Sequence, residues 1–69
     1  MPVLIFKTNV QKKSQAKKII KMLIVQLPGH KINFDLEDCD KILRVEGNNI
    51  QENKVIRQVS DQGFEVIPL

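Results

Sequence analysis

The chain has 69 residues, a formal net charge of +3 and one cysteine. This length fits one small folding unit, so we expect a single domain over residues 1–69. Its longest apolar runs, Val3 to Phe6 and Met22 to Val25, are far too short to span a bilayer. A lone cysteine cannot form an internal disulfide, and no secretory signal opens the sequence, so we expect a cytoplasmic location.

The first half of the sequence predicts a strand followed by a helix. Val3 to Thr8 is a run of β-formers with the length of a buried strand. From about Lys13 to Leu27, apolar residues recur at the three- and four-residue spacings of one helix face; they are Ala16, Ile19, Ile20, Leu23, Ile24 and Leu27. Pro28-Gly29 ends this helix, because proline interrupts the hydrogen-bond ladder and glycine accepts the conformation common after a helix.

The next segment predicts a β-hairpin. Apolar and polar residues alternate from Lys31 to Glu37, which is typical of a strand with one face in a core. Asp38-Cys39-Asp40 forms a polar break, and a second strand follows from Lys41 to Glu46.

The last third predicts a second helix and a short final strand. After the turn residues Gly47-Asn48-Asn49, a helical repeat of Val55, Ile56 and Val59 continues until Gly63. Phe64 to Ile67 then forms an edge strand that tolerates Pro68 at its end. The order βαββαβ with right-handed crossovers predicts an α+β, ferredoxin-like fold, in which two helices cover one face of a four-stranded antiparallel sheet.

Charge is segregated along the sequence. Residues 1–31 contain lysines but no acid, whereas every Asp and Glu lies within residues 35–65, so we expect one electropositive end. A cluster of lysines falls on the start and outer face of the first helix, where the helix dipole also favours an anion: Lys12, Lys13, Lys17, Lys18 and Lys21. We interpret this cluster either as a solvated face or as a docking or anion-binding patch.

Three segments resemble the heavy-metal-associated domains of copper chaperones and metal-transporting ATPases. Phe6-Lys7-Thr8-Asn9-Val10 looks like the strand leading into their metal loop, Leu27-Pro28-Gly29 like the end of their first helix, and Gly63-Phe64 like the approach to their final strand. The resemblance covers nearly the whole chain. It implies the same fold and docking through the loop and helix-one face.

The metal ligands of that family are missing. Its loop after the first strand carries a Cys-x-x-Cys pair that binds a soft ion such as Cu(I) or Zn(II). Alignment on the first segment puts Lys12 and Gln15 at these vestigial positions, and alignment on the second puts Lys13 and Ala16 there. None is a soft ligand, and a lysine ammonium has no lone pair to donate. The resemblance therefore implies a degenerate member with no cofactor.

The remaining candidates predict little chemistry. We interpret Cys39 as an incidental exposed thiol and expect His30 to be a surface residue without partners, at the end of the sheet opposite the degenerate loop. An acidic tract lacks the spacing and glycine of a calcium loop; it comprises Asp35, Glu37, Asp38 and Asp40. Phe64 is expected to be buried or half-buried near the degenerate loop. No combination typical of catalysis is present, so we predict no enzyme.

Three functions are open at this point. The leading hypothesis is a protein-interaction module that meets an acidic surface or a related domain through the lysine-rich loop and helix-one face. The second is an accessory protein that binds or helps transport Cu or Zn through Cys39 or ligands in trans. The third, an anion or nucleic-acid binder, is disfavoured because no Tyr or Trp can stack on bases. Homodimerisation through an edge strand, or through Met22 and Val25, is also open.

Overall fold

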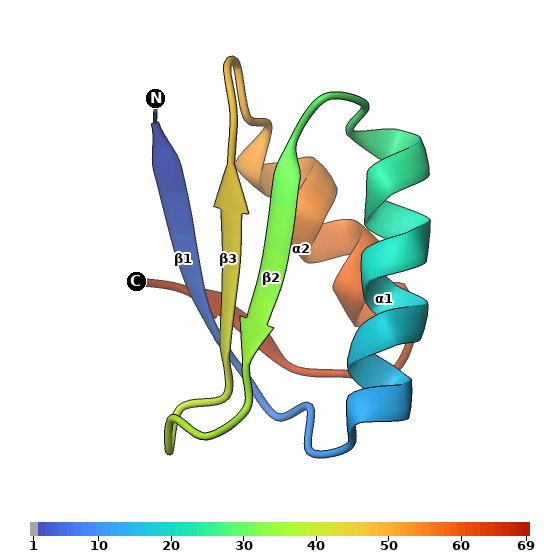
Figure 1. Cartoon of the computed structure of the whole chain (residues 1–69), viewed down its shortest axis with the longest axis vertical. Coiled ribbons are helices and arrows are strands. Elements are labelled where there is room, and N and C mark those ends of the chain that lie inside the picture. Colours follow the sequence, from blue (N-terminus) through green and yellow to red (C-terminus); the bar gives the residue numbers. More distant parts are fainter. Residues whose placement is uncertain (1) are drawn as a thin grey trace.

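The computed structural model describes residues 2–69, which form four strands and two helices. The strands are β1 (Val3–Thr8), β2 (Lys31–Asp35), β3 (Ile42–Glu46) and β4 (Val66–Pro68), and the helices are α1 (Lys13–Gln26) and α2 (Glu52–Asp61). One antiparallel sheet has the strand order β2-β3-β1-β4, and both helices cover the same face (Figure 1). The predicted α+β, ferredoxin-like arrangement is therefore confirmed. No helix in residues 2–69 combines the length and apolarity needed to cross a membrane.

Strand pairing determines which loops meet. Because β1 and β2 both pair antiparallel with β3, they run in the same direction and end at the same edge of the molecule. The loops that follow them lie together there, and the α1–β2 connection lies at the opposite end (Figure 1).

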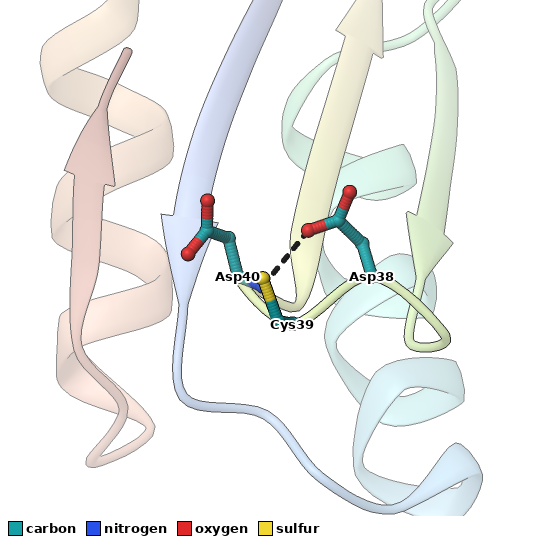
Figure 2. A group of neighbouring side chains, drawn as sticks. All are labelled: Asp38, Cys39 and Asp40. Atoms are coloured by element: carbon teal, nitrogen blue, oxygen red, sulfur yellow. Dashed lines mark hydrogen bonds between the residues drawn. The ribbon is translucent and has the colours of Figure 1, made fainter.

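Thr8, at the end of β1, ties the two neighbouring loops together. Its backbone N–H donates to the Asp40 carbonyl at 3.0 Å, and its hydroxyl donates to the Lys41 carbonyl. The same hydroxyl accepts the backbone N–H of Val10 at 3.3 Å. Figure 2 shows the loop after β2 in this position, beside the end of β1. Thr8 thereby links the loop that leads to Lys12 with the loop that contains Asp38, Cys39 and Asp40.

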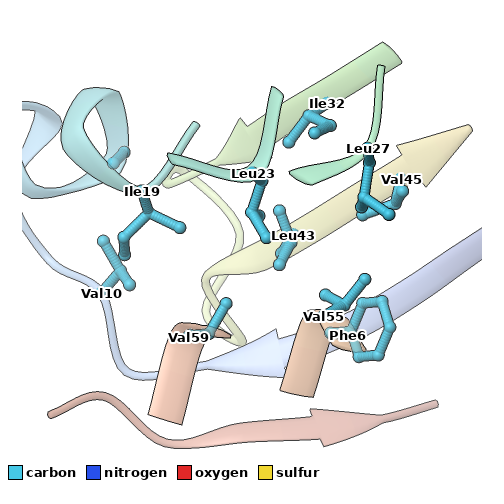
Figure 3. Packing of buried hydrophobic residues seen from close by; sticks show 11 residues of the cluster. Phe6, Val10, Ile19, Leu23, Leu27, Ile32, Leu43, Val45, Val55 and Val59 are labelled. Carbon is cyan, nitrogen blue, oxygen red and sulfur yellow. The ribbon is translucent and has the colours of Figure 1, made fainter. Parts of the chain in front are cut away.

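The core fills the space between the sheet and the two helices. Its fully buried side chains come from four segments, which are β1 with the loop after it, α1, β3 and α2: Phe6 and Val10, Ile19 and Leu23, Leu43 and Val45, and Val55 and Val59 (Figure 3). Each such aliphatic or aromatic side chain contributes about 1.5–3 kcal/mol by leaving water. Thus most of the helical repeats expected for α1 and α2 face the sheet, but Ile24 of the α1 repeat is 49% exposed.

β1 is half-buried, so the prediction of a buried strand is wrong. Phe6 and Thr8 face the helices, whereas Val3 is 42% exposed and Lys7 is also exposed. Both helices lie on one face of the sheet, and no described element covers the other face. The continuous run of β-formers therefore has one side in the core and one side open.

Predicted boundaries of three strands differ by one or two residues, and α1 ends at Gln26 rather than Leu27. β2 ends at Asp35 rather than Glu37, and β4 begins at Val66 rather than Phe64. β3 begins at Ile42 because Lys41 adopts a left-handed backbone with φ of 47° and belongs to the turn. The edge position expected for Pro68 is confirmed, since β4 pairs only with β1.

Candidate functional site

The predicted lysine cluster is exposed, but the helix divides it. All five lysines, from Lys12 to Lys21, are exposed. Successive residues of a helix are rotated by about 100°. With the buried side of α1 against the sheet, Lys13 and Lys17 lie towards β2, where both line a groove. Lys18 and Lys21 lie on the outer face of α1, away from the sheet. We call these two residues, with Lys12 at the start of the helix, the outer lysine face.

The start of α1 carries charges that oppose its dipole. Lys12 is the N-cap residue, and its ammonium cannot accept a hydrogen bond from the first turn. Gln15 supplies half of a capping box, because its Oε1 accepts the backbone N–H of Lys12 at 3.2 Å. Lys12 and Lys13 lie at the positive end of the helix dipole with no acid in the first turn, and no base lies in the last turn to offset this. Stabilisation of the helix dipole therefore does not explain Lys12 and Lys13.

No acid within residues 2–69 forms an ion pair with these lysines. The ion pair that the described residues contain joins Lys7 Nζ to Asp40 Oδ1 at 3.6 Å, with side chains 51% and 42% exposed. An exposed pair of this kind contributes only about 0–1 kcal/mol. The ammonium groups of the outer lysine face are thus directed to solvent.

The expected electropositive end is not found. Lys12 and Lys13 lie at the end of the molecule where β1 stops, but the loop after β2 brings Asp38 and Asp40 to the same end (Figures 1 and 2). Because β1 and β2 run in the same direction, the basic and acidic halves of the sequence are interleaved in space. Positive charge is concentrated on the helix surface instead.

The vestigial metal positions hold no soft ligand in either alignment. Lys12 is exposed and Gln15 is half-buried, with its amide oxygen bonded to the loop backbone. In the alternative alignment Lys13 is exposed and Ala16 is 5% exposed within the core. These residues cap and pack the helix start, which is a structural role.

A groove of about 400 Å³ separates α1 from β2. Lys13 and Lys17 border it on the helix side, and Asp35 and Glu37 border it on the strand side. Between them lie apolar or neutral side chains, which are Ala16, Ile20, Asn33, Phe34 and Leu36. A larger hollow of about 750 Å³ lies along α2 and is lined mostly by polar side chains. Of these two hollows, the groove between α1 and β2 is the one with an apolar floor and charged side chains on both sides.

The loop after β2 brings three potential metal ligands together. One ligand atom each from Asp38, Cys39 and Asp40 lie within 4.8 Å of one another (Figure 2). Cys39 is exposed, as predicted. Both carboxylates already have partners, because Asp38 Oδ1 accepts the Asp40 N–H at 2.8 Å and Asp40 pairs with Lys7. A cation would have to compete with these contacts. The other two acids of the predicted tract, Asp35 and Glu37, lie outside this group.

His30 lies opposite the degenerate loop, as expected, but it is not a surface residue without partners. Its half-buried ring packs so closely on Gly47 that a Cβ there would lie 2.6 Å from Cδ2. Nδ1 donates to the Pro28 carbonyl at 3.2 Å, while Nε2 is buried and has no partner in residues 2–69. The prediction is wrong because no sequence pattern indicated that the turn after β3 returns to this residue.

Phe64 lies where we expected it. Its ring is half-buried and packs against the core. The adjacent Glu65 donates its backbone N–H to Asn9 Oδ1 at 2.9 Å, which holds the segment before β4 beside the loop after β1. Asn9 is a link between loops that sequence reasoning missed, and an asparagine just after a strand was its only signal.

Comparison of the chain with family models, curated proteins and solved structures gives no match. The resemblance to heavy-metal-associated domains therefore rests on the residues quoted above, and the functional argument rests on the geometry of this chain.

Proposed function

We propose that the chain is a non-enzymatic relative of the heavy-metal-associated domains, lacks their metal-binding cysteines, and docks onto an acidic protein surface through the outer lysine face. One observation carries the proposal. Lys18 and Lys21 are exposed and unpaired within residues 2–69, and Lys12 adds a further positive charge at the start of the same helix. Such a face is suited to meeting carboxylates supplied by another molecule.

The sheet favours a protein partner over single-stranded nucleic acid. Ferredoxin-like sheets that bind RNA stack bases on aromatic side chains of their open face. Here Phe6 is fully buried, and Phe34 and Phe64 pack against the core. The two central strands, β1 and β3, place aliphatic and charged residues on the open face instead.

The proposal includes a reducing compartment such as the cytoplasm. Cys39 is exposed and no second cysteine exists in the chain for an internal disulfide.

Binding to an acidic probe tests the proposal. A peptide of consecutive glutamates would be titrated into ¹⁵N-labelled protein, with a glutamine peptide as the neutral control. We expect amide shifts along the exposed side of α1 that weaken as salt is added. In Lys18→Gln/Lys21→Gln, affinity should fall by about tenfold, because two charge-assisted contacts of about 0.7 kcal/mol each are lost.

Arg44→Gln/Arg57→Gln is the matched control. It removes the same charge from exposed positions on β3 and α2, so a general electrostatic attraction would fall equally in both variants. The proposal requires the control to bind like the wild type. Equal losses in the two variants, or shifts confined to the open face of the sheet, would contradict it.

The cluster of Asp38, Cys39 and Asp40 supports a second candidate, binding of Cu(I) or Zn(II) with further ligands in trans. Both ions would be titrated into the reduced protein against a competing chelator. Saturable binding that disappears in Cys39→Ser would favour this candidate. Absence of binding at chelator-buffered concentrations would end it and leave the outer lysine face as the site.

A further inference from the structure

The two edges of the sheet differ in what they offer to another strand. β4 has three residues and ends on Pro68, whose nitrogen has no hydrogen to donate. β2 has five residues, contains no proline, and pairs with β3 on one side only. An edge strand bonded on one side directs alternate N–H and C=O groups outward, which makes it a template for a further strand. β2 is therefore the edge able to accept one.

The sequence of β2 is complementary to itself. In an antiparallel pair centred on Asn33, Lys31 of one copy stands opposite Asp35 of the other, and Ile32 stands opposite Phe34. Residues directly opposite each other point to the same face, so each charged pair lies on the open face and each apolar pair on the helix side. Each charged residue of β2 therefore faces an opposite charge on a second copy of this chain, and each apolar residue faces an apolar one.

Other pairings of the same edges lose this match. Parallel pairing in register would put Lys31 opposite Lys31 and Asp35 opposite Asp35, which repel. With the centre at Ile32, Lys31 would face Asn33 and Asp35 would face Gly29, so both charged pairs are lost. With the centre at Phe34, Asp35 would face Asn33, and Lys31 would face Glu37, which lies beyond the end of β2. Within β2, Lys31 and Asp35 are therefore both matched only in the register centred on Asn33.

The groove beside β2 adds apolar surface to the same edge. Ile20 borders the groove, and Ile24, one helical turn further on, is 49% exposed although its spacing belongs to the buried face. Phe34 is half-buried at the groove floor. A two-fold axis perpendicular to the sheet at Asn33 keeps both helix layers on one side and brings the β2-facing sides of the two α1 helices towards each other. These side chains would then be covered.

We propose that the chain forms a homodimer in which the two β2 strands pair antiparallel about Asn33, joining two four-stranded sheets into one. The surface concerned is distinct from the outer lysine face, because Lys18 and Lys21 do not line the groove beside β2. The inference therefore goes beyond the proposed function and does not depend on it.

Charge exchange tests the register directly. The molar mass of the wild-type protein would be measured by sedimentation equilibrium from about 10 µM to about 1 mM, the range in which weak dimers dissociate. We expect the mass to rise from that of one chain towards that of two. Asp35→Lys and Lys31→Asp each replace two attractive pairs by two repulsive ones, so each should raise the dissociation constant by about tenfold or more.

The double variant Lys31→Asp/Asp35→Lys restores opposite charges in the same register and should recover dimerisation. Asp61→Lys makes the same charge change as Asp35→Lys at an exposed residue of α2, and should dimerise like the wild type. Circular dichroism would establish that each variant is folded. A wild-type protein that stays monomeric at about 1 mM, single exchanges without effect, or a double exchange that fails to recover would each overturn the proposal.

Discussion

Substitution of Gly47 by alanine should destabilise the protein through one contact. Gly47 lies outside the left-handed region, so its backbone accepts alanine. The new Cβ would lie 2.6 Å from Cδ2 and 2.8 Å from Cγ of His30, which is closer than such atoms approach in proteins. Neither side moves freely, because the ring is bonded to Pro28 and the Gly47 N–H donates to Pro2 at 3.1 Å. Overpacking of this kind costs about 1–3 kcal/mol.

A double-mutant cycle separates this clash from other effects. Gly47→Ala, His30→Ala and the double variant would be unfolded in urea and followed by far-ultraviolet circular dichroism. In the wild-type background we expect Gly47→Ala to lose about 2 kcal/mol, equivalent to roughly 8–16 °C in melting temperature for a domain of this size. Without the ring, the same change should be neutral or stabilising by about 0.4–1 kcal/mol, because alanine restricts the unfolded chain.

The coupling energy between the two sites should therefore be about 2 kcal/mol or more, with a change of sign in the effect of alanine. Additive losses in the two backgrounds would refute the reasoning, since they would place the cost of the extra methyl group away from His30.

The remaining predictions concern the loop junction, the second helix end, the lysine face and the β2 edge. Thr8→Val keeps the shape of a residue that is 6% exposed but leaves the Lys41 carbonyl without its donor, so unfolding free energy should fall by about 1–3 kcal/mol in the same urea assay. Gly63→Ala should cost about 1 kcal/mol for its φ of 90° alone, because no atom lies within 4 Å of the added Cβ; a cost above about 3 kcal/mol would reveal a contact that the geometry does not contain. Glutamate-peptide binding should fall about tenfold in Lys18→Gln/Lys21→Gln, and dimerisation about tenfold in Asp35→Lys, each variant retaining the other property.

Local periodicity was sufficient to predict the architecture. The helical spacing of Ala16, Ile19 and Leu23 places these residues in the core, and the alternation around Ile32 places β2 with one face inward. Pro28 and Gly29 did mark the end of α1, where Gly29 has the positive φ expected after a helix, and Gly63 did mark the end of α2. Each of these signals arises from the conformation of a few adjacent residues, which is why a single sequence reveals them.

Contacts between distant segments were not predictable in the same way. The packing of His30 on Gly47 joins the α1–β2 connection to the turn after β3, and neither turn has a pattern that specifies the other. Ile24 follows the helical repeat yet is 49% exposed, and its spacing alone does not distinguish it from the buried Ile19. The meeting of basic and acidic residues at the end of the molecule where β1 and β2 stop was equally unpredictable. It depends on the strand order and not on local sequence.

Dimerisation through β2 would strengthen binding by the outer lysine face. A dimer built about Asn33 would present both α1 helices on the same side of one continuous sheet, with their outer lysine faces directed away from the sheet. Two faces held rigidly together bind a partner with two acidic segments more tightly than either face does, because the second contact forms at a high effective concentration. Weak individual contacts, of the size expected for exposed lysines, would then be sufficient for a specific complex. In a monomer, β2 leaves backbone groups without a partner strand, and Lys12 lies unfavourably at the positive end of the α1 dipole. In such an assembly, β2 would be paired and Lys12 would belong to the binding surface.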